Sequence, residues 1–186
     1  NLFREELGIP EEKKIVLYQG GLFLGRGIEG LLSAFSKHDD GKHVLVCMGF
    51  GELENMIKGY AAQHGNIYFQ PAAAPNIVLQ YTSSADIGVS YIDNPSLNDR
   101  LCLPNKLFEF IMAGLPVLVN DAPEMKKLVT KNKVGAVLKE LTFEAIEEGI
   151  TKLNNMDQEK LAQNLKAAGE KYCWENQEKI MIEAYN

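Results

Sequence analysis

Short apolar runs alternate with longer stretches of helical periodicity over the first three quarters of this chain. The runs are apolar on both faces, which is typical of strands in a parallel sheet that helices cover on both sides. The predicted strands are Ile15–Gln19, His43–Met48, Ile67–Gln70, Asp86–Ser90, Val117–Asn120 and Gly135–Leu138. The predicted helices between them are Gly27–Ser36, Gly51–His64, Ala74–Tyr81, Pro104–Ala113 and Pro123–Thr130. This alternation predicts an α/β fold, a Rossmann-like doubly wound parallel sheet of about six strands.

After Leu138 the pattern is helical only. Three further helices are predicted, at Thr142–Asn154, Asp157–Tyr172 and Trp174–Tyr185. Thr142 and Asp157 can accept hydrogen bonds from the free N–H groups of a first helical turn, and Asp157 is the better cap. We expect these extra C-terminal helices to pack alongside the sheet, with Trp174 as a packing anchor.

The length of 186 residues and the apolar content of 46% suit the core of one domain spanning residues 1–186. The chain begins with Asn1 inside an amphipathic segment, so we expect it to be a piece of a longer protein. No apolar run has the length of a membrane span, and the expected location is cytoplasmic, without a secretory signal.

Charge, cysteines and histidines exclude several classes of site. The net charge of −6 is mild, and no basic block suggests a nucleic-acid surface. Cys47, Cys102 and Cys173 lie far apart, without metal-ligand spacing or a disulfide framework, which indicates a reducing compartment. Cys47 lies in an apolar run and is expected in the core. None of the three histidines accompanies a nucleophile or a metal-ligating cluster, so neither a Ser–His–Asp triad nor a zinc site is predicted.

In doubly wound sheets, ligands bind beyond the carboxyl ends of the strands. The first strand runs into the loop QGGLFLGRG, whose glycines would let the backbone approach a phosphate and whose Arg26 could bind it in a fork. A tight turn without a ligand is the alternative, since the spacing is neither a dinucleotide fingerprint nor a P-loop. The small residues Pro71–Pro75 could receive a flat base. The polar loop Tyr91–Leu103 is either functional or a solvated turn.

The segment LPNKLFEFIMAGLPVLV, from Leu103 to Val119, is the most informative part of the chain. Pro104 suits the first turn of a helix and Gly114 suits its end. Lys106 and Glu109 share one face of the first turns, beside free N–H groups and the positive end of the helix dipole. A solvated surface pair is the alternative. Because most of this helix is apolar and therefore buried, we favour a site for a phosphate and a sugar hydroxyl.

Together these motifs resemble the nucleotide-sugar-binding C-terminal half of retaining GT-B glycosyltransferases, the glycosyl transferases group 1 family. The resemblance rests on KIVLYQGGLFLGRGIEGLLSAF, HVLVCMGFGELENMIK, NKLFEFIMAGLPVLV and the closing YCWENQEKIMIEAY, and covers essentially the whole chain. It implies transfer of a sugar from a nucleoside diphosphate to an acceptor such as a glycan, polysaccharide or lipid precursor. It also implies an N-terminal acceptor-binding half, absent here, through which alone membrane association is expected, and little turnover by this domain on its own.

The resemblance also implies roles for individual residues. Glu109 matches the ribose-binding residue of the family. The diphosphate is expected at Gly20, Gly21, Arg26, Lys106 and Leu107, and the base at Gln70, Pro71 and Ala72. No cofactor or metal is expected, because cations and helix N–H groups would stabilise the leaving diphosphate. The catalytic residues, the base and the sugar stay unassigned.

Two positions depart from the family pattern. Leu101 stands where many members have a sugar-proximal Glu, eight positions before Glu109, and Gly21 stands where many have an Arg. Two alternatives therefore stay open. One is half of a non-hydrolysing nucleotide-sugar 2-epimerase, which would need His and acidic residues in the cleft. The other is a non-catalytic nucleotide-binding or scaffold module.

Overall fold

One parallel sheet organises the protein. The computed structural model describes residues 1–93 and 96–185. Its six strands lie in the order β3-β2-β1-β4-β5-β6, and every pairing is parallel. The strands are β1 Lys14–Gly21, β2 His43–Phe50, β3 Ile67–Pro71, β4 Ile87–Ser90, β5 Val117–Asn120 and β6 Gly135–Leu138. The predicted fold class is confirmed, and each observed strand overlaps a predicted one.

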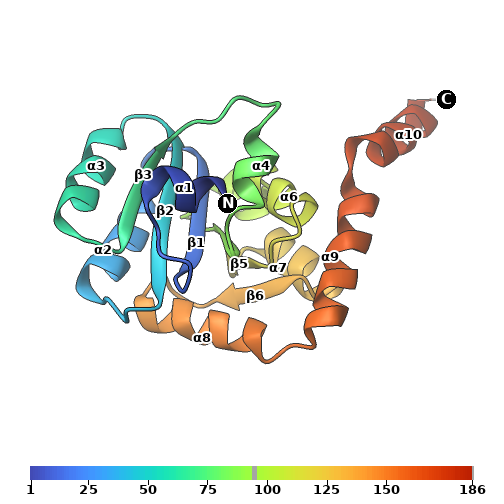
Figure 1. Ribbon diagram of the computed structural model, residues 1–186. Coiled ribbons are helices and arrows are strands. Elements are labelled where there is room, and N and C mark those ends of the chain that lie inside the picture. The colour runs from blue at the N-terminus through green and yellow to red at the C-terminus, as the bar shows by residue number, and fades with distance from the viewer. Residues whose placement is uncertain (94–95, 186) are drawn as a thin grey trace.

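Helices cover both faces of the sheet (Figure 1). Side chains of α2, α3 and α8 pack with Val16, Tyr18 and Leu45 on one face. Side chains of α1, α6, α7 and α9 pack with Leu17, Val46 and Val119 on the other. The helices are α1 Leu2–Leu7, α2 Ile28–Lys37, α3 Glu54–Gln63, α4 Val78–Thr82, α5 Leu97–Leu101, α6 Asn105–Met112, α7 Pro123–Asn132, α8 Phe143–Asn154, α9 Gln158–Tyr172 and α10 Trp174–Tyr185. Because side chains point alternately to the two faces along each strand, the sheet contributes to two separate hydrophobic cores.

The chain reverses its direction of winding at the centre of the sheet. Strand β1 pairs with β2 on one side and with β4 on the other, so the loops after β1 and β4 diverge. A doubly wound sheet opens a crevice for ligands at such a switch point. Helix α6 follows β4 and α5 in the chain, and its fully buried Phe110 lies where a side chain on Gly88 of β4 would be. This contact seats α6 directly against β4.

Several predicted elements differ in detail. Helices α1 and α5 were not predicted as helices, because each is shorter than the length at which periodicity is informative. Helix α4 covers only the second half of the predicted Ala74–Tyr81, and α3 begins three residues later than predicted. Positions 94–95 of the predicted polar loop lie outside the described residues.

The prediction that Trp174 anchors the last helix is wrong. Its side chain is 62% exposed, and α10 has no buried residue. Figure 1 shows α10 reaching away from the body of the protein beyond the end of α9. An apolar side chain contributes packing energy only where neighbouring atoms surround it, and the sequence pattern cannot show whether they do.

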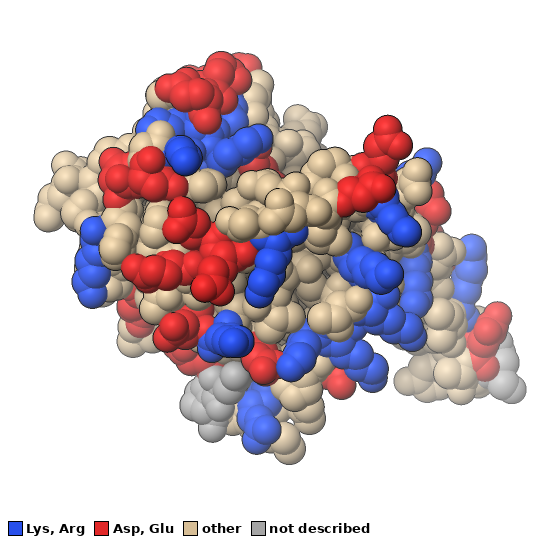
Figure 2. Space-filling model, turned by 90° about the horizontal axis from the view of Figure 1, so that it is seen from below, with Lys and Arg blue, Asp and Glu red and all other residues tan. Residues whose placement is uncertain are grey.

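Charge is more segregated on the surface than the mild net charge suggests. Seen from below, Lys and Arg gather in the right half of the face, and many Asp and Glu lie in its left half (Figure 2). Along the chain, α7 and the residue after it carry four lysines, Lys126, Lys127, Lys131 and Lys133. Lys126 pairs with Asp121 and Lys127 with Glu124, at N···O distances of 2.8 and 3.8 Å. Exposed pairs of this kind contribute little to stability.

Candidate nucleotide site at the carboxyl edge

The carboxyl edge, meaning the ends of the parallel strands and the loops that follow them, brings the glycine-rich turns together. Gly20 of β1 lies opposite Gly49 of β2 in the register of the sheet. A Cβ on Gly49 would lie 1.9 Å from the Gly20 carbonyl oxygen. Only glycine allows the two backbones to approach so closely. Glycine at position 49 therefore allows the backbones of β1 and β2 to lie close together at the carboxyl edge.

Lys106 extends from the first turn of α6 toward Tyr18 and Gly20 of β1. Its Nζ lies 3.6 Å from the centroid of the Tyr18 ring, and its Cε lies 3.6 Å from the point where a Gly20 side chain would begin. The ring face attracts the ammonium group, and the Tyr18 hydroxyl donates a hydrogen bond to the Gly21 carbonyl at 2.8 Å. A Cβ at position 20 would only touch the lysine, and the φ of +113° is what favours glycine there.

The environment of Lys106 disfavours its positive charge. Burial lowers the pKa of the lysine to about 7, the nearby Arg26 lowers it further, and Glu109 and Cys47 oppose the shift. Burial also raises the pKa of the Cys47 thiol to about 12, which agrees with the predicted core position of that residue. A lysine that is desolvated in this way gains most when an anion arrives beside it.

Glu109 lies one turn after Lys106 and is held by a buried glutamine. Gln19 Nε2 donates to Glu109 Oε2 at 2.5 Å, and Gln19 is 1% exposed. Gln19 Oε1 in turn accepts a hydrogen bond from Thr82 Oγ1 at 2.8 Å. Sequence reasoning missed Gln19 and Thr82 as parts of this site. No local signal could identify Thr82, since 63 positions separate it from Gln19.

The glycine loop carries Arg26 at its exposed end. The backbone there is fixed, because the Asp93 N–H donates to the Gly25 carbonyl at 3.0 Å and a side chain on Gly27 would meet Tyr91. Arg26 makes no ion pair with any residue in the described part of the chain. Its guanidinium is therefore available to an anion.

Two other residues predicted to contact the diphosphate are less open than expected. Leu107 is fully buried, and its N–H donates to the Pro104 carbonyl at 3.0 Å. Any amide contact at this end of α6 would therefore come from the N–H groups before Leu107, which have no acceptor within a helix. Gly21 is covered by Phe23, whose ring lies 2.8 Å from the point where a side chain at 21 would begin. Phe23 thus occupies the space that an Arg at position 21 would need.

The loop predicted to receive the base lies at the end of β3, and its first residue is already engaged. Gln70 Nε2 donates to Glu6 Oε2 at 2.8 Å, and the Tyr81 hydroxyl donates to the same carboxylate at 2.7 Å. Pro71 and Ala72 are exposed. Helix α1 therefore holds the Gln70 side chain, and the backbone of Pro71 and Ala72 is left as the predicted contact for a base.

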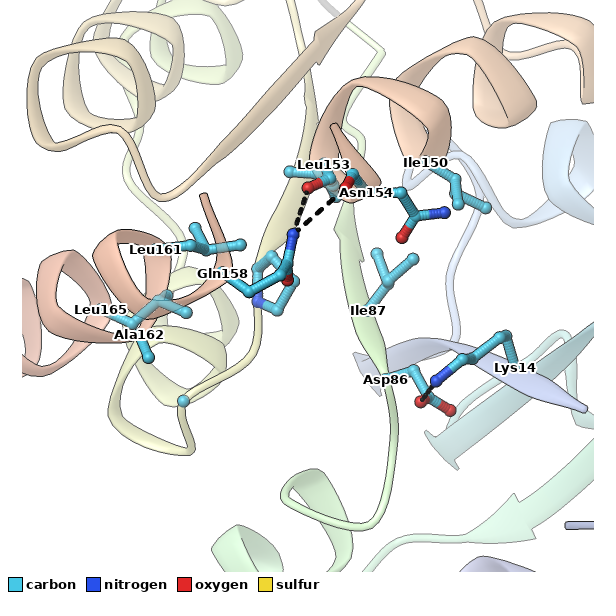
Figure 3. Close-up of a pocket in the computed structure, with 12 residues that line it drawn as sticks. Lys14, Asp86, Ile87, Ile150, Leu153, Asn154, Gln158, Leu161, Ala162 and Leu165 are labelled. Carbon is cyan, nitrogen blue, oxygen red and sulfur yellow. Dashed lines mark hydrogen bonds and ion pairs between the residues drawn. The ribbon is translucent and has the colours of Figure 1, made fainter. Parts of the chain in front are cut away.

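A cavity also lies away from the predicted site residues (Figure 3). It has a volume of about 230 Å³ and lies at the opposite, amino edge of the sheet, between β4, α8 and α9. Gln158 is used there to cap α8, donating to the Leu153 carbonyl at 2.9 Å, and Lys14 is paired with Asp86 at 2.8 Å. The cavity is lined mainly by aliphatic side chains and is remote from the predicted site residues.

The structure contains neither of two other kinds of functional feature within residues 1–93 and 96–185. No three His, Cys, Asp or Glu side chains in these ranges are grouped so that they could hold a metal ion. No helix in the same ranges has both the length and the apolar character needed to cross a bilayer.

The sequence and the fold are similar to known glycosyltransferases. A curated relative, an uncharacterised glycosyltransferase of Methanocaldococcus jannaschii, is 24% identical over 98% of this chain and 47% of its own length. A glycosyltransferase of Rickettsia africae is similar in structure, with a TM-score of 0.77 and 14% identity over 98% of this chain and 49% of that one. Anabaena HepE in complex with UDP-glucose gives a TM-score of 0.68 and 18% identity over 91% of this chain and 46% of that one.

At these identities the structural likeness shows the fold alone, and the chain spans about half the length of the curated relative. The family itself is shown by a sequence model, that of the glycosyl transferases group 1, which matches residues 1–172. The chain belongs to the glycosyl transferases group 1 family.

Proposed function

We propose that this chain is the donor-binding half of a glycosyltransferase and holds a nucleoside diphosphate sugar at its carboxyl edge. The observation that carries the proposal is that two suitable side chains lie one turn apart on α6. They are Lys106, whose pKa is lowered to about 7, and Glu109, which Gln19 holds in place. A cation suits the diphosphate and a carboxylate suits the ribose hydroxyls. An acceptor-binding half would complete such an enzyme.

The proposed chemistry places developing negative charge where the cations lie. When the bond between sugar and diphosphate breaks, the diphosphate leaves with an additional negative charge. Lys106 and Arg26 would stabilise that charge, together with the first N–H groups of α6. The sugar and the acceptor stay open, as do a role in polysaccharide biosynthesis and a cytoplasmic location, which we propose from the family alone.

The alternative of a 2-epimerase is not favoured by the positions of the histidines. His38 and His64 follow the ends of α2 and α3, and His43 begins β2. All three therefore lie toward the amino edge of the sheet, opposite Lys106 and Glu109. His43 is also paired with Asp40, with an Nδ1···Oδ2 distance of 2.6 Å.

Calorimetric titration with UDP, GDP and their sugars tests the proposal. We expect at least one diphosphate to bind, and the corresponding nucleoside without phosphate to bind far more weakly. Folded protein that binds none of these ligands would contradict the donor-binding function. Such a result would favour the non-catalytic scaffold, for which the absence of the sugar-proximal Glu at Leu101 already gives some support.

The lowered pKa of Lys106 predicts that binding takes up a proton. The bound diphosphate favours the charged lysine, so affinity is highest below the free-state pKa of about 7 and falls as the pH rises above it. The dissociation constant is expected to rise by up to about tenfold per pH unit between pH 7 and 9. Calorimetry in buffers of different ionisation enthalpy measures the proton directly. Equal affinity at pH 7 and 9 without proton uptake would contradict this role of Lys106.

The ring over Gly21 makes a second prediction possible. Gly21→Arg alone should not strengthen diphosphate binding, because the Phe23 ring blocks the start of the new side chain. The double variant Gly21→Arg with Phe23→Ala should strengthen it, by roughly tenfold for one added charge-assisted hydrogen bond. Titrations of both variants and of Phe23→Ala measure the difference. Improved binding by the single Gly21→Arg variant would show that Phe23 does not block the position.

A further inference from the structure

A buried amide links three elements behind Glu109. Gln19 comes from β1, Thr82 from the end of α4, and Glu109 from α6. The carboxylate of Glu109 can only accept, so the nitrogen of the Gln19 amide must face it and the oxygen must face Thr82. Both ends of the amide are thus used, within a residue that is 1% exposed.

Thr82 completes this arrangement from the opposite side. Its hydroxyl lies 2.8 Å from Gln19 Oε1 and 2.8 Å from the Val78 carbonyl, and its one proton is shared between these two acceptors. Thr82 is fully buried. A buried amide oxygen without a donor is unfavourable, so Thr82 fixes the orientation of Gln19.

The arrangement leaves one carboxylate oxygen of Glu109 for a ligand. Oε2 accepts from Gln19, whereas Oε1 has no hydrogen-bond partner within the described residues. A carboxylate that is held at one oxygen loses little further freedom when the other oxygen binds a hydroxyl. The same restraint means that a ligand without hydroxyls there would leave this oxygen unpaired.

We propose that Gln19 and Thr82 are positioning residues that orient Glu109 for the ribose hydroxyls of the nucleotide. This inference rests on the proposed function, because it assumes a nucleotide at Glu109. It adds that recognition of ribose depends on two buried residues that never touch the ligand. Thr82 lies at the end of α4, the first helix after the loop predicted to receive the base.

Matched variants and a matched ligand test the inference. Gln19→Met keeps the length of the side chain and removes both hydrogen bonds, Thr82→Val removes the hydroxyl, and Thr82→Ser keeps it. The ligands are the diphosphate that binds best to the unaltered protein and its 2′,3′-dideoxy analogue. Gln19→Met should weaken binding of the ribose form about tenfold, and Thr82→Val about threefold, as expected for lost buried hydrogen bonds. Thr82→Ser should bind like the unaltered protein, and the dideoxy analogue should bind all four proteins alike.

A second readout does not depend on nucleotide binding. Carbon NMR should show a changed chemical shift of the Glu109 carboxyl in Gln19→Met, because the hydrogen bond from the Gln19 amide is lost. If the unaltered protein bound no nucleotide, the proposed function would fail, and the carboxyl signal would still report whether Gln19 restrains Glu109. Equal losses for both ligands would assign Gln19 a purely structural role. An unchanged carboxyl signal of Glu109 in Gln19→Met, or unchanged ribose selectivity in both Gln19→Met and Thr82→Val, would overturn the inference.

Discussion

Replacing Lys106 by Met should weaken nucleoside diphosphate binding by roughly 10- to 100-fold, the range expected for a lost hydrogen bond to a charged group. Met has a similar length and no charge, so it fills the space between Tyr18 and Gly20 without offering a donor. Calorimetric titration with the diphosphate that binds best measures the loss. The variant should also take up no proton on binding.

The same substitution should stabilise the fold. The pKa of Lys106 is lowered in the folded state to about 7, from an ordinary value of 10.5. The unfolded chain therefore holds more protons between about pH 7 and 10.5, and the stability of the unaltered protein rises with pH across that window. Lys106→Met lacks this rise. Its advantage in free energy of unfolding should be full below pH 7 and should shrink toward pH 10.

Lys131→Met is the matched control, because Lys131 is an exposed lysine at the end of α7. It should change neither the affinity nor the pH dependence of stability. Urea denaturation at several pH values gives the comparison. If a Lys106→Met variant binds the diphosphate normally, Lys106 is not part of the binding site. One that is less stable than the unaltered protein at pH 6 would contradict the description of Lys106 as desolvated.

Replacing Phe110 by Ala should destabilise the protein by about 3–5 kcal/mol, as expected for removing a fully buried aromatic ring. Its ring packs against Gly88 of β4, and a Cβ there would lie 2.4 Å from the ring. No side chain on β4 can fill the space that the ring leaves. Because Phe110 directly follows Glu109, loss of this contact should also loosen the site and weaken nucleotide binding in the fraction that remains folded.

Phe108→Ala on the same helix is the comparison. Phe108 is half-buried, and its ring centroid lies 5.8 Å from that of Tyr172 of α9. Phe108→Ala should lower the free energy of unfolding clearly less than Phe110→Ala does, because solvent can reach the cavity and neighbouring side chains can move into it. Urea denaturation of both variants provides the free energies. Equal losses would show that the contact between Phe110 and Gly88 does not seat α6.

Much of the fold could be predicted because the strands are buried on both faces. Continuous apolar runs such as Val117–Asn120 and Gly135–Leu138 gave the observed bounds, since strands in a covered sheet tolerate few polar residues. Gly114 has φ +79°, as predicted for a helix end. The short helices α1 and α5 were missed because five or six residues do not establish a period. The exposure of α10 was missed because the sequence does not show which residues surround a helix.

The candidate site could be predicted only in part, and for a physical reason. Lys106 and Glu109 share one turn of α6, so their spacing alone puts them on one face. The partners that give them their properties come from distant segments. Gln19 lies 90 positions from Glu109, and Glu6 lies 64 positions from Gln70. The family pattern also could not show that Phe23 fills the space beside Gly21, because that requires the course of the loop.

The most direct test of the site is to locate a bound nucleotide by NMR. The labelled protein would be titrated with UDP and with GDP while its backbone amide signals are followed. We predict that the largest changes occur at Gly20, Gly21, Arg26 and the first turn of α6. Changes confined to the amino edge, around Leu153 and Ala162, or no changes with either ligand, would contradict a nucleotide site at Lys106 and Glu109.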